Sequence, residues 1–215
     1  MSGRPSSLRS AHNSRKLSLK RKGYLLAFGA ASIFLLAFLL FSLGAFAPGA
    51  ATSSAATTAT MTSYGISASS VIASAAAQAP AGYSQASSKQ LNPKESGLQS
   101  GGFALFSGQG GSLGNMTILV FDTPQSAQAY IDSVVSNAKE LSGYHDFSSA
   151  LANYQRYGLC YGFGETDPAG NGAVATGVCT KGNVYIQVHL VSPVSLSLAQ
   201  EDVSALVGAA YQGIN

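Results

Sequence analysis

The residues of this sequence best suited to chemistry are two cysteines, Cys160 and Cys179, which flank a glycine-rich stretch and are the only cysteines in the chain. Such a pair can form a disulfide or contribute to a metal site. A metal site needs further ligands at suitable spacing, and no CxxC or HxxxH motif accompanies these two residues. We therefore expect a disulfide and, with it, an oxidising compartment outside the cytoplasm.

The turn between the cysteines predicts how they meet. Residues 167–172 read DPAGNG, and the midpoint of this segment is also the midpoint between Cys160 and Cys179. If the segment closes a hairpin symmetrically, the cysteines lie opposite each other on antiparallel strands, where Cα atoms are about 4.5–5.5 Å apart. A disulfide can span that distance.

Side chains alternate between the two faces of such a hairpin. One face carries the large residues Tyr157, Leu159, Tyr161, Phe163, Val174, Thr176 and Val178. The other carries the small residues Gly158, Cys160, Gly162, Gly164, Ala173, Ala175, Gly177 and Cys179. We expect the large face to lie in the core. The small face, which we call the small floor, is predicted to be nearly bare backbone because its side chains are short. Glycine in a strand often marks close approach by a ligand or another backbone, so we expect something to cover this floor.

The next strand, residues 184–191 (VYIQVHLV), has an apolar face of its own, and the length of the preceding loop decides where that face points. A loop of residues 181–182 would bury the polar side chains of this strand in the core. A loop of residues 181–183 instead pairs Val178 with Ile186 and keeps the apolar face in the core. We adopt the longer loop, because an asparagine at its third position suits the left-handed conformation that such loops often need.

This register brings polar side chains to the rim of the small floor. An aromatic ring, an amide, an imidazole and a guanidinium would surround it, and such a set can hold a ligand or a protein partner. The candidate binding surface consists of Arg156, Gly158, Gly162, Ala175, Gly177, Tyr185, Gln187 and His189. The alternatives are that solvent covers the floor or that the alanine-rich residues 69–78 fold back over it.

No enzyme motif accompanies these residues. The loop GQGGSLG at residues 108–114 fails both the dinucleotide-binding and the phosphate-loop patterns. His145 and His189 have no assigned nucleophile. We expect no catalytic residue, no cofactor and no metal. Asn115, in the sequence Asn-Met-Thr, is a candidate glycosylation site.

Two strands, a helix, three strands and a second helix are expected to position these residues. The segments 101–107 and 115–122 read as a hairpin with a glycine-rich loop. Thr123 and Pro124 begin a helix, and Ser197 is expected to begin the last one. The predicted fold class is therefore α+β, an antiparallel sheet in the order β-β-α-β-β-β-α with both helices on one face.

The N-terminal part predicts a membrane anchor. Residues 1–22 hold seven basic residues and no acid, whereas residues 89–215 hold five basic residues and all nine acids. Residues 23–47 carry no charge, and about 20 apolar residues cross a bilayer. Positive flanks stay in the cytoplasm. We expect a basic cytoplasmic tail (1–22), a transmembrane helix (23–47), an Ala/Ser/Thr-rich stalk (48–88) and an extracytoplasmic domain (89–215).

Two alternatives concern the N-terminal segment. Residues 45–47 (AFA) would suit cleavage after a secretory signal peptide. Residues 20–23 (KRKG), followed by an unbroken apolar helix, resemble the start of prokaryotic and archaeal type IV pilin-like precursors. This resemblance implies cleavage after Gly23 and a pilin-like subunit. Pilins usually carry a glutamate at the fifth place of the mature chain, where this sequence has Phe28.

These patterns together predict a non-catalytic binding or accessory module of the cell envelope, held by a signal-anchor helix. Its expected partners are the lipid bilayer, through residues 23–47, and a membrane or envelope protein complex. Nucleic acid is not expected, because the basic residues adjoin the apolar span and act there as a topology signal. An exported enzyme is the other hypothesis.

Overall fold

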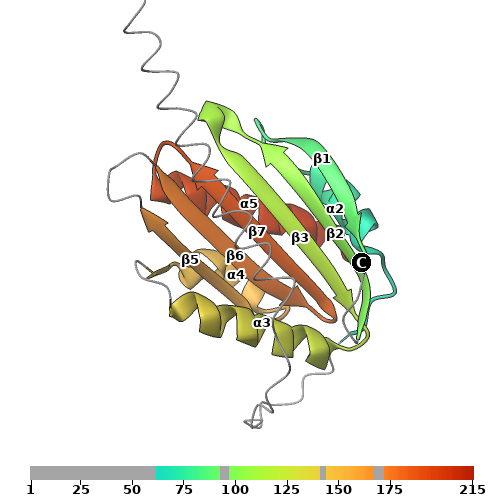
Figure 1. Cartoon of the computed structure of the whole chain (residues 1–215). Helices are drawn as coiled ribbons and strands as arrows, with labels where there is room; N and C mark the ends of the chain where they lie inside the picture. Colours follow the sequence, from blue (N-terminus) through green and yellow to red (C-terminus); the bar gives the residue numbers. More distant parts are fainter. Residues whose placement is uncertain (1–61, 93–96, 141–143, 167–171) are drawn as a thin grey trace, which may run out of the picture. The chain divides into compact units, whose positions relative to one another are not determined.

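The structure, a computed structural model, describes residues 62–92, 97–140, 144–166 and 172–215. Its centre is a seven-stranded antiparallel sheet with the order β1-β2-β3-β7-β6-β5-β4 (Figure 1). The strands are β1 (Ser84–Leu91), β2 (Leu98–Ser107), β3 (Leu113–Phe121), β4 (His145–Asp146), β5 (Cys160–Thr166), β6 (Ala173–Lys181) and β7 (Val184–Ser192). The helices are α2 (Ala68–Ala77), α3 (Pro124–Lys139), α4 (Ala152–Gln155) and α5 (Leu196–Gln212), with 3-10 turns η1 (Gln109–Gly111) and η2 (Ser148–Leu151). The predicted α+β class with an antiparallel sheet is confirmed.

Apolar side chains form a core on each face of the sheet. Helices α2 and α5 cover one face, with a core that includes Val71, Ile72, Met116, Ile118, Val120, Ile186, Val188, Val203, Leu206 and Val207. Helix α3 packs on the other face, with a core that includes Leu119, Phe121, Ile131, Val135, Phe163, Val178 and Tyr185. The prediction that both long helices share one face is therefore wrong. The central strands are apolar on both faces, so each helix buries its stripe in a separate layer.

The domain begins before the position predicted from the sequence. Helix α2 lies in the core beside α5, and β1 pairs with β2 along its length. The predicted stalk, residues 48–88, thus contains a helix and part of a strand of the domain. Small residues are sufficient in α2 because the helix approaches β2 closely at Gly102, where an added Cβ would lie 2.7 Å from Cδ1 of Ile72.

The chain that leads into α2 is held by Asn183, which lies in the turn between β6 and β7. Its Nδ2 donates to the carbonyl oxygens of Phe121, at 2.7 Å, and Tyr64, at 3.2 Å. Its Oδ1 accepts from the main-chain N–H of Tyr64 at 2.6 Å. Because this buried amide is satisfied on both sides, it joins residues 62–66 to the ends of β3 and β7.

The helix starts follow side-chain caps. Thr123 caps α3 as predicted, since its Oγ1 accepts from the main-chain N–H of Ser126 at 3.1 Å. Helix α5 begins earlier than predicted: Ser195, in an extended conformation, accepts from the N–H of Leu198 at 3.2 Å. The predicted cap, Ser197, lies inside the first turn. Ser195 takes the role because its extended backbone aims its hydroxyl at the first free N–H groups.

The register between β6 and β7 differs from the prediction by one residue. Only Gly182 and Asn183 form the turn, so Val178 lies opposite Gln187 and not opposite Ile186. Gly182 adopts the left-handed conformation with φ of 58°, which a two-residue hairpin turn requires. A slip of one residue moves every side chain of β7 to the other face of the sheet.

The predictions for the N-terminus lie outside the described residues. They are the tail (1–22), the transmembrane helix (23–47) with its pilin-like start, the cleavage site at 45–47 and the first part of the stalk. Within the described residues, no helix has the length and apolar character needed to cross a bilayer. The topology inferred from charge stays a prediction.

Candidate functional site

The small floor predicted from the sequence is covered by the domain itself. A Cβ at Gly162 would lie 2.6 Å from Cδ2 of Phe147, and a Cβ at Gly177 would lie 2.7 Å from Cγ1 of Val203 on α5. Ala175 is fully buried. The interpretation of these residues as an open binding floor is therefore wrong. They let α5 and the segment before η2 pack closely on β5 and β6, and residues 69–78 do not supply the cover.

The polar residues of the predicted surface lie on the opposite face, on the side of α3, because of the shifted register. The Tyr185 hydroxyl donates to Oε1 of Gln187 at 2.8 Å, and Nδ1 of His189 lies 2.8 Å from Oγ1 of Thr176. Burial raises the pKa of Tyr185 and lowers the pKa of His189 to about 4. The structure thus separates these three residues from the small ones.

The other predicted surface residues lie just before β5. The Cζ atom of Arg156 lies 4.6 Å from the ring centroid of Tyr157, which is exposed. Gly158 runs close to Thr180, whose carbonyl oxygen would lie 2.2 Å from an added Cβ. The eight residues of the candidate surface therefore do not form one site.

Cys160 and Cys179 form the predicted disulfide and lie opposite each other in the predicted register. Both are buried, and the Cys160 Sγ lies 3.5 Å from the hydroxyl oxygen of Tyr211. That hydroxyl donates to the carbonyl oxygen of Thr180 at 2.7 Å. The disulfide therefore joins β5 to β6 beneath α5, in a structural role.

Lys181 closes the C-terminal end of α5. Its Nζ donates to the carbonyl oxygens of Tyr211, at 3.1 Å, and Ile214. The same Nζ lies 5.6 Å and 5.7 Å from the ring centroids of Tyr64 and Tyr157. Burial lowers the pKa of Lys181. Because the last carbonyl groups of a helix have no partners within it and attract cations, this lysine acts as a cap.

Asn115, the asparagine of the glycosylation sequence, lies in the central strand β3. It pairs with Leu105 on one side and His189 on the other, and its side chain is only 7% exposed. A glycan at this position has no room in the folded domain, so the structure argues against the candidate glycosylation site. Among the described residues, no group of three or more His, Cys, Asp or Glu side chains could hold a metal ion. The predictions that the protein uses no metal and no cofactor stay predictions.

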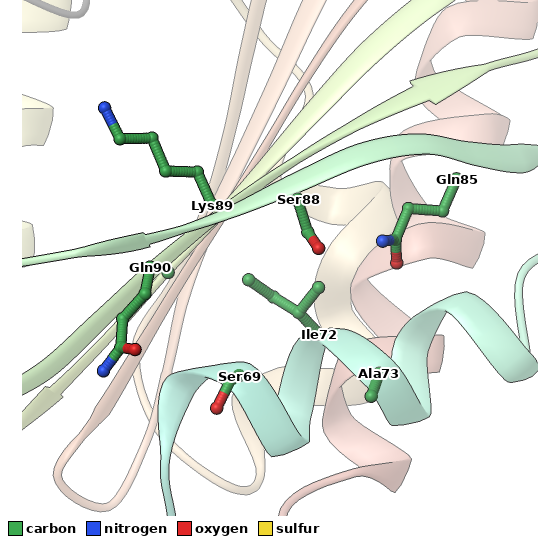
Figure 2. A pocket seen from close by; sticks show the side chains of 8 residues that line it. Ser69, Ile72, Ala73, Gln85, Ser88, Lys89 and Gln90 are labelled. Carbon is green, nitrogen blue, oxygen red and sulfur yellow. The ribbon is translucent and has the colours of Figure 1, made fainter.

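A different site lies between helix α2 and the edge strand β1 (Figure 2). This groove is lined by Ser69, Ile72 and Ala73 of α2, by Gln85, Ser88, Lys89 and Gln90 of β1, and by Gly102 of β2. Its volume is about 120 Å³. Sites that hold a complete small molecule measure about 300–1,000 Å³. The groove therefore suits one or two side chains of a larger ligand.

The alternation of β1 decides which of its side chains line the groove. Ser88 and Gln90 point toward α2, whereas Lys89 points away from the helix (Figure 2). Ile72 projects from α2 toward β1 and makes part of the groove apolar. The groove thus combines an apolar wall with polar groups and a charge at its rim.

The polar side chains of β1 are available to a ligand. Gln85, Ser88, Lys89 and Gln90 are exposed. Within the described part of the chain, none of the four forms a side-chain hydrogen bond or ion pair. A ligand would therefore displace only solvent from them.

Sequence analysis missed this site because residues 84–91 (SQASSKQL) contain no apolar alternation. A strand that is solvated on both faces does not show the period of two by which half-buried strands are recognised. The alanine-rich residues 69–78, most of which form α2, were the available signal, since their apolar side chains require a surface to pack on.

Neither a family model nor a curated protein sequence matches this chain. Among solved structures, the chain is similar to the crystal structure of the extracellular domain of PknH from Mycobacterium tuberculosis, with 12% sequence identity and a TM-score of 0.47. The match covers 68% of this chain and 92% of that one. We draw no conclusion about this protein from a likeness of that degree.

Proposed function

We propose that this protein is a non-catalytic binding or accessory module of the cell envelope, anchored in the membrane by residues 23–47 with its disulfide-bonded domain outside the cytoplasm. Its partners are the bilayer and a protein of a membrane or envelope complex. The proposal for the anchor rests on the uncharged apolar segment and on the concentration of basic residues before it. The disulfide supports the oxidising compartment.

The observation that carries the binding function is the groove between α2 and β1. It lies on an exposed edge of the sheet, and its polar side chains have no protein partner among the described residues. Its small volume suits side chains of a protein better than a complete small molecule. We therefore place the binding of a protein partner at this edge.

Site-specific crosslinking in the cells that make the protein tests this function. A photo-crosslinking amino acid at Gln90, in the groove, should give one adduct of defined mass on the full-length chain. The same amino acid at Ser136, exposed on α3 at the other side of the sheet, should not give that adduct.

A matched pair of substitutions on α2 supplies the control. Ala73→Phe should fill the groove from the helix side and remove the adduct, because Ala73 lines it. Ala77→Phe makes the same change on the same helix at an exposed position outside the groove, and the adduct should persist. An adduct of equal yield from Ser136, or one that survives Ala73→Phe, would rule out the groove as the binding site.

A further inference from the structure

Strand β1 offers a free edge to other chains. It is the end strand of the sheet and is eight residues long, whereas β4, at the other end, has two residues. Along an edge strand, every second N–H and C=O group points away from the sheet without a strand partner. Within the described part of the chain, no strand pairs with the outer edge of β1.

The regular part of this edge coincides with the groove. A bulge at Ala86 interrupts the pairing of β1 with β2, and residues 87–91 beyond it pair without interruption. Ser88, Lys89 and Gln90, which line the groove, are in this regular stretch. Main-chain hydrogen-bonding groups and a hollow for side chains are therefore available at the same place.

We propose that this edge binds an extended peptide segment of a partner protein, which joins the sheet as a further strand beside β1. The segment carries an acidic side chain opposite Lys89, between two small apolar side chains that enter the groove. This inference rests on the proposed binding function and adds the chemistry of the partner to it.

The charge at the edge defines the central residue of the segment. Among the residues that the structure describes, Lys89 is the only charged one that lines the groove, and it is exposed. In a paired strand, the residue directly opposite lies on the same face, with its Cβ about 4.5–5.5 Å away, and opposite charges at that distance attract. A carboxylate opposite Lys89 is therefore favoured, and an ammonium group is disfavoured.

The groove defines the neighbours of that residue. Because side chains alternate, the residues on either side of the acid point to the face of Ser88 and Gln90, toward α2 (Figure 2). There they meet Ile72 and Ala73 in a space of about 120 Å³. Small β-branched side chains suit this space and also favour the extended conformation.

The same features disfavour a second copy of this chain as the occupant. An antiparallel pair of two β1 strands centred on Lys89 would put two ammonium groups directly opposite each other, which is destabilising. Centring the pair nearer the start of the strand brings the bulge at Ala86 into the contact, and centring it nearer the end shortens the regular stretch that can pair. A lysine on an edge strand is also a common device against self-pairing.

The test uses the full-length protein in lipid nanodiscs and blocked, fluorescently labelled peptides of sequence TVEVT and TVKVT, with binding followed by fluorescence anisotropy. The native protein should prefer the glutamate peptide, and Lys89→Glu should reverse the preference. One exposed ion pair accounts for about a two- to fivefold change in affinity, so the ratio of the two affinities should shift by about four- to twenty-fivefold. Lys89 is exposed, and an unchanged melting temperature will show that the variant folds.

N-methylated peptides test whether the segment joins the sheet. Successive N–H groups of a strand point in opposite directions, so methylating the glutamate nitrogen or the next nitrogen should abolish binding in one peptide and spare it in the other. Equal binding of TVEVT and TVKVT, equal effects of the two methylations, or no binding of any peptide would overturn the inference. If the adduct at Gln90 still forms and still depends on Ala73, the proposed function stands without it.

Discussion

The Cα atoms of Cys160 and Cys179 lie 4.1 Å apart on the neighbouring strands β5 and β6, and the two side chains form a disulfide under helix α5. The bond closes a loop with a sequence separation of 19 residues and therefore restricts the unfolded chain. It also lies next to the hydroxyl of Tyr211, so the last helix packs on this crosslink.

Removal of the disulfide should destabilise the domain without changing its fold. In the double variant Cys160→Ala/Cys179→Ala, the free energy of unfolding should fall by about 3 kcal/mol, the chain-entropy value for a loop of this size. Denaturant unfolding measures the change. Thiol labelling of the unfolded, unreduced native protein should find no free cysteine, and two labelled thiols would contradict the crosslink.

Enlarging Gly177 should destabilise the core. The Cβ of Gly177→Leu would lie 2.7 Å from Cγ1 of Val203 and 3.3 Å from Cδ1 of Leu151. Overpacking of this kind costs about 1–3 kcal/mol. Thermal unfolding should show a lower melting temperature, whereas Gly65→Leu, at a position with no atom within 4 Å of an added Cβ, should leave it nearly unchanged. Equal melting temperatures for the two variants would mean that α5 does not cover this face.

Alkaline pH should unfold the domain. Burial is the main cause that raises the pKa of Tyr83, Tyr185 and Tyr211, and a hydrogen bond to Asp202 adds to it at Tyr83. Groups whose pKa is higher in the folded state contribute stability that is complete below their unfolded pKa of about 10 and is lost as the pH rises above it. Lys181, whose pKa burial lowers, acts in the opposite direction and offsets a part of the loss.

The measurement for the alkaline transition is the melting temperature as a function of pH, together with the absorbance of tyrosinate. The melting temperature should fall above about pH 10, and the tyrosinate of Tyr83, Tyr185 and Tyr211 should appear together with unfolding rather than before it. Tyr211→Phe should flatten the pH dependence, because it removes one of the tyrosines whose pKa burial raises. Smooth titration of all tyrosines in a domain that stays folded would contradict the prediction.

The orientation in the membrane should follow the charges. Protease added to intact cells should remove the domain, residues 62–215, and spare the basic tail, because positively charged flanks stay in the cytoplasm. An antibody against the first 22 residues detects the surviving fragment. Lysed cells provide the control in which the tail is also degraded. Protection of the domain in intact cells would mean that the domain lies in the cytoplasm. The argument for the disulfide from an oxidising compartment would then fail.

Local signals in the sequence were sufficient for several elements. The turn at residues 167–172 is symmetric about the cysteines, so the β5–β6 register and the disulfide followed from counting residues. Thr123 and Pro124 predicted the start of α3 because capping depends only on neighbouring residues. The sequence by itself therefore determined the fold class, the β5–β6 hairpin, the disulfide and the start of α3.

Only the tertiary structure decided which surfaces are covered and which are open. Gly182 and Asn183 permit more than one turn, and a one-residue difference moved Gln187 and His189 to the side of α3. The stripes of α3 and α5 look alike in sequence, and the central strands are apolar on both faces, so nothing local assigns either helix to a face. Strand β1 has no apolar period at all, and it is a strand because β2 lies beside it. The groove exists for the same reason, since it forms where that pairing brings β1 next to α2.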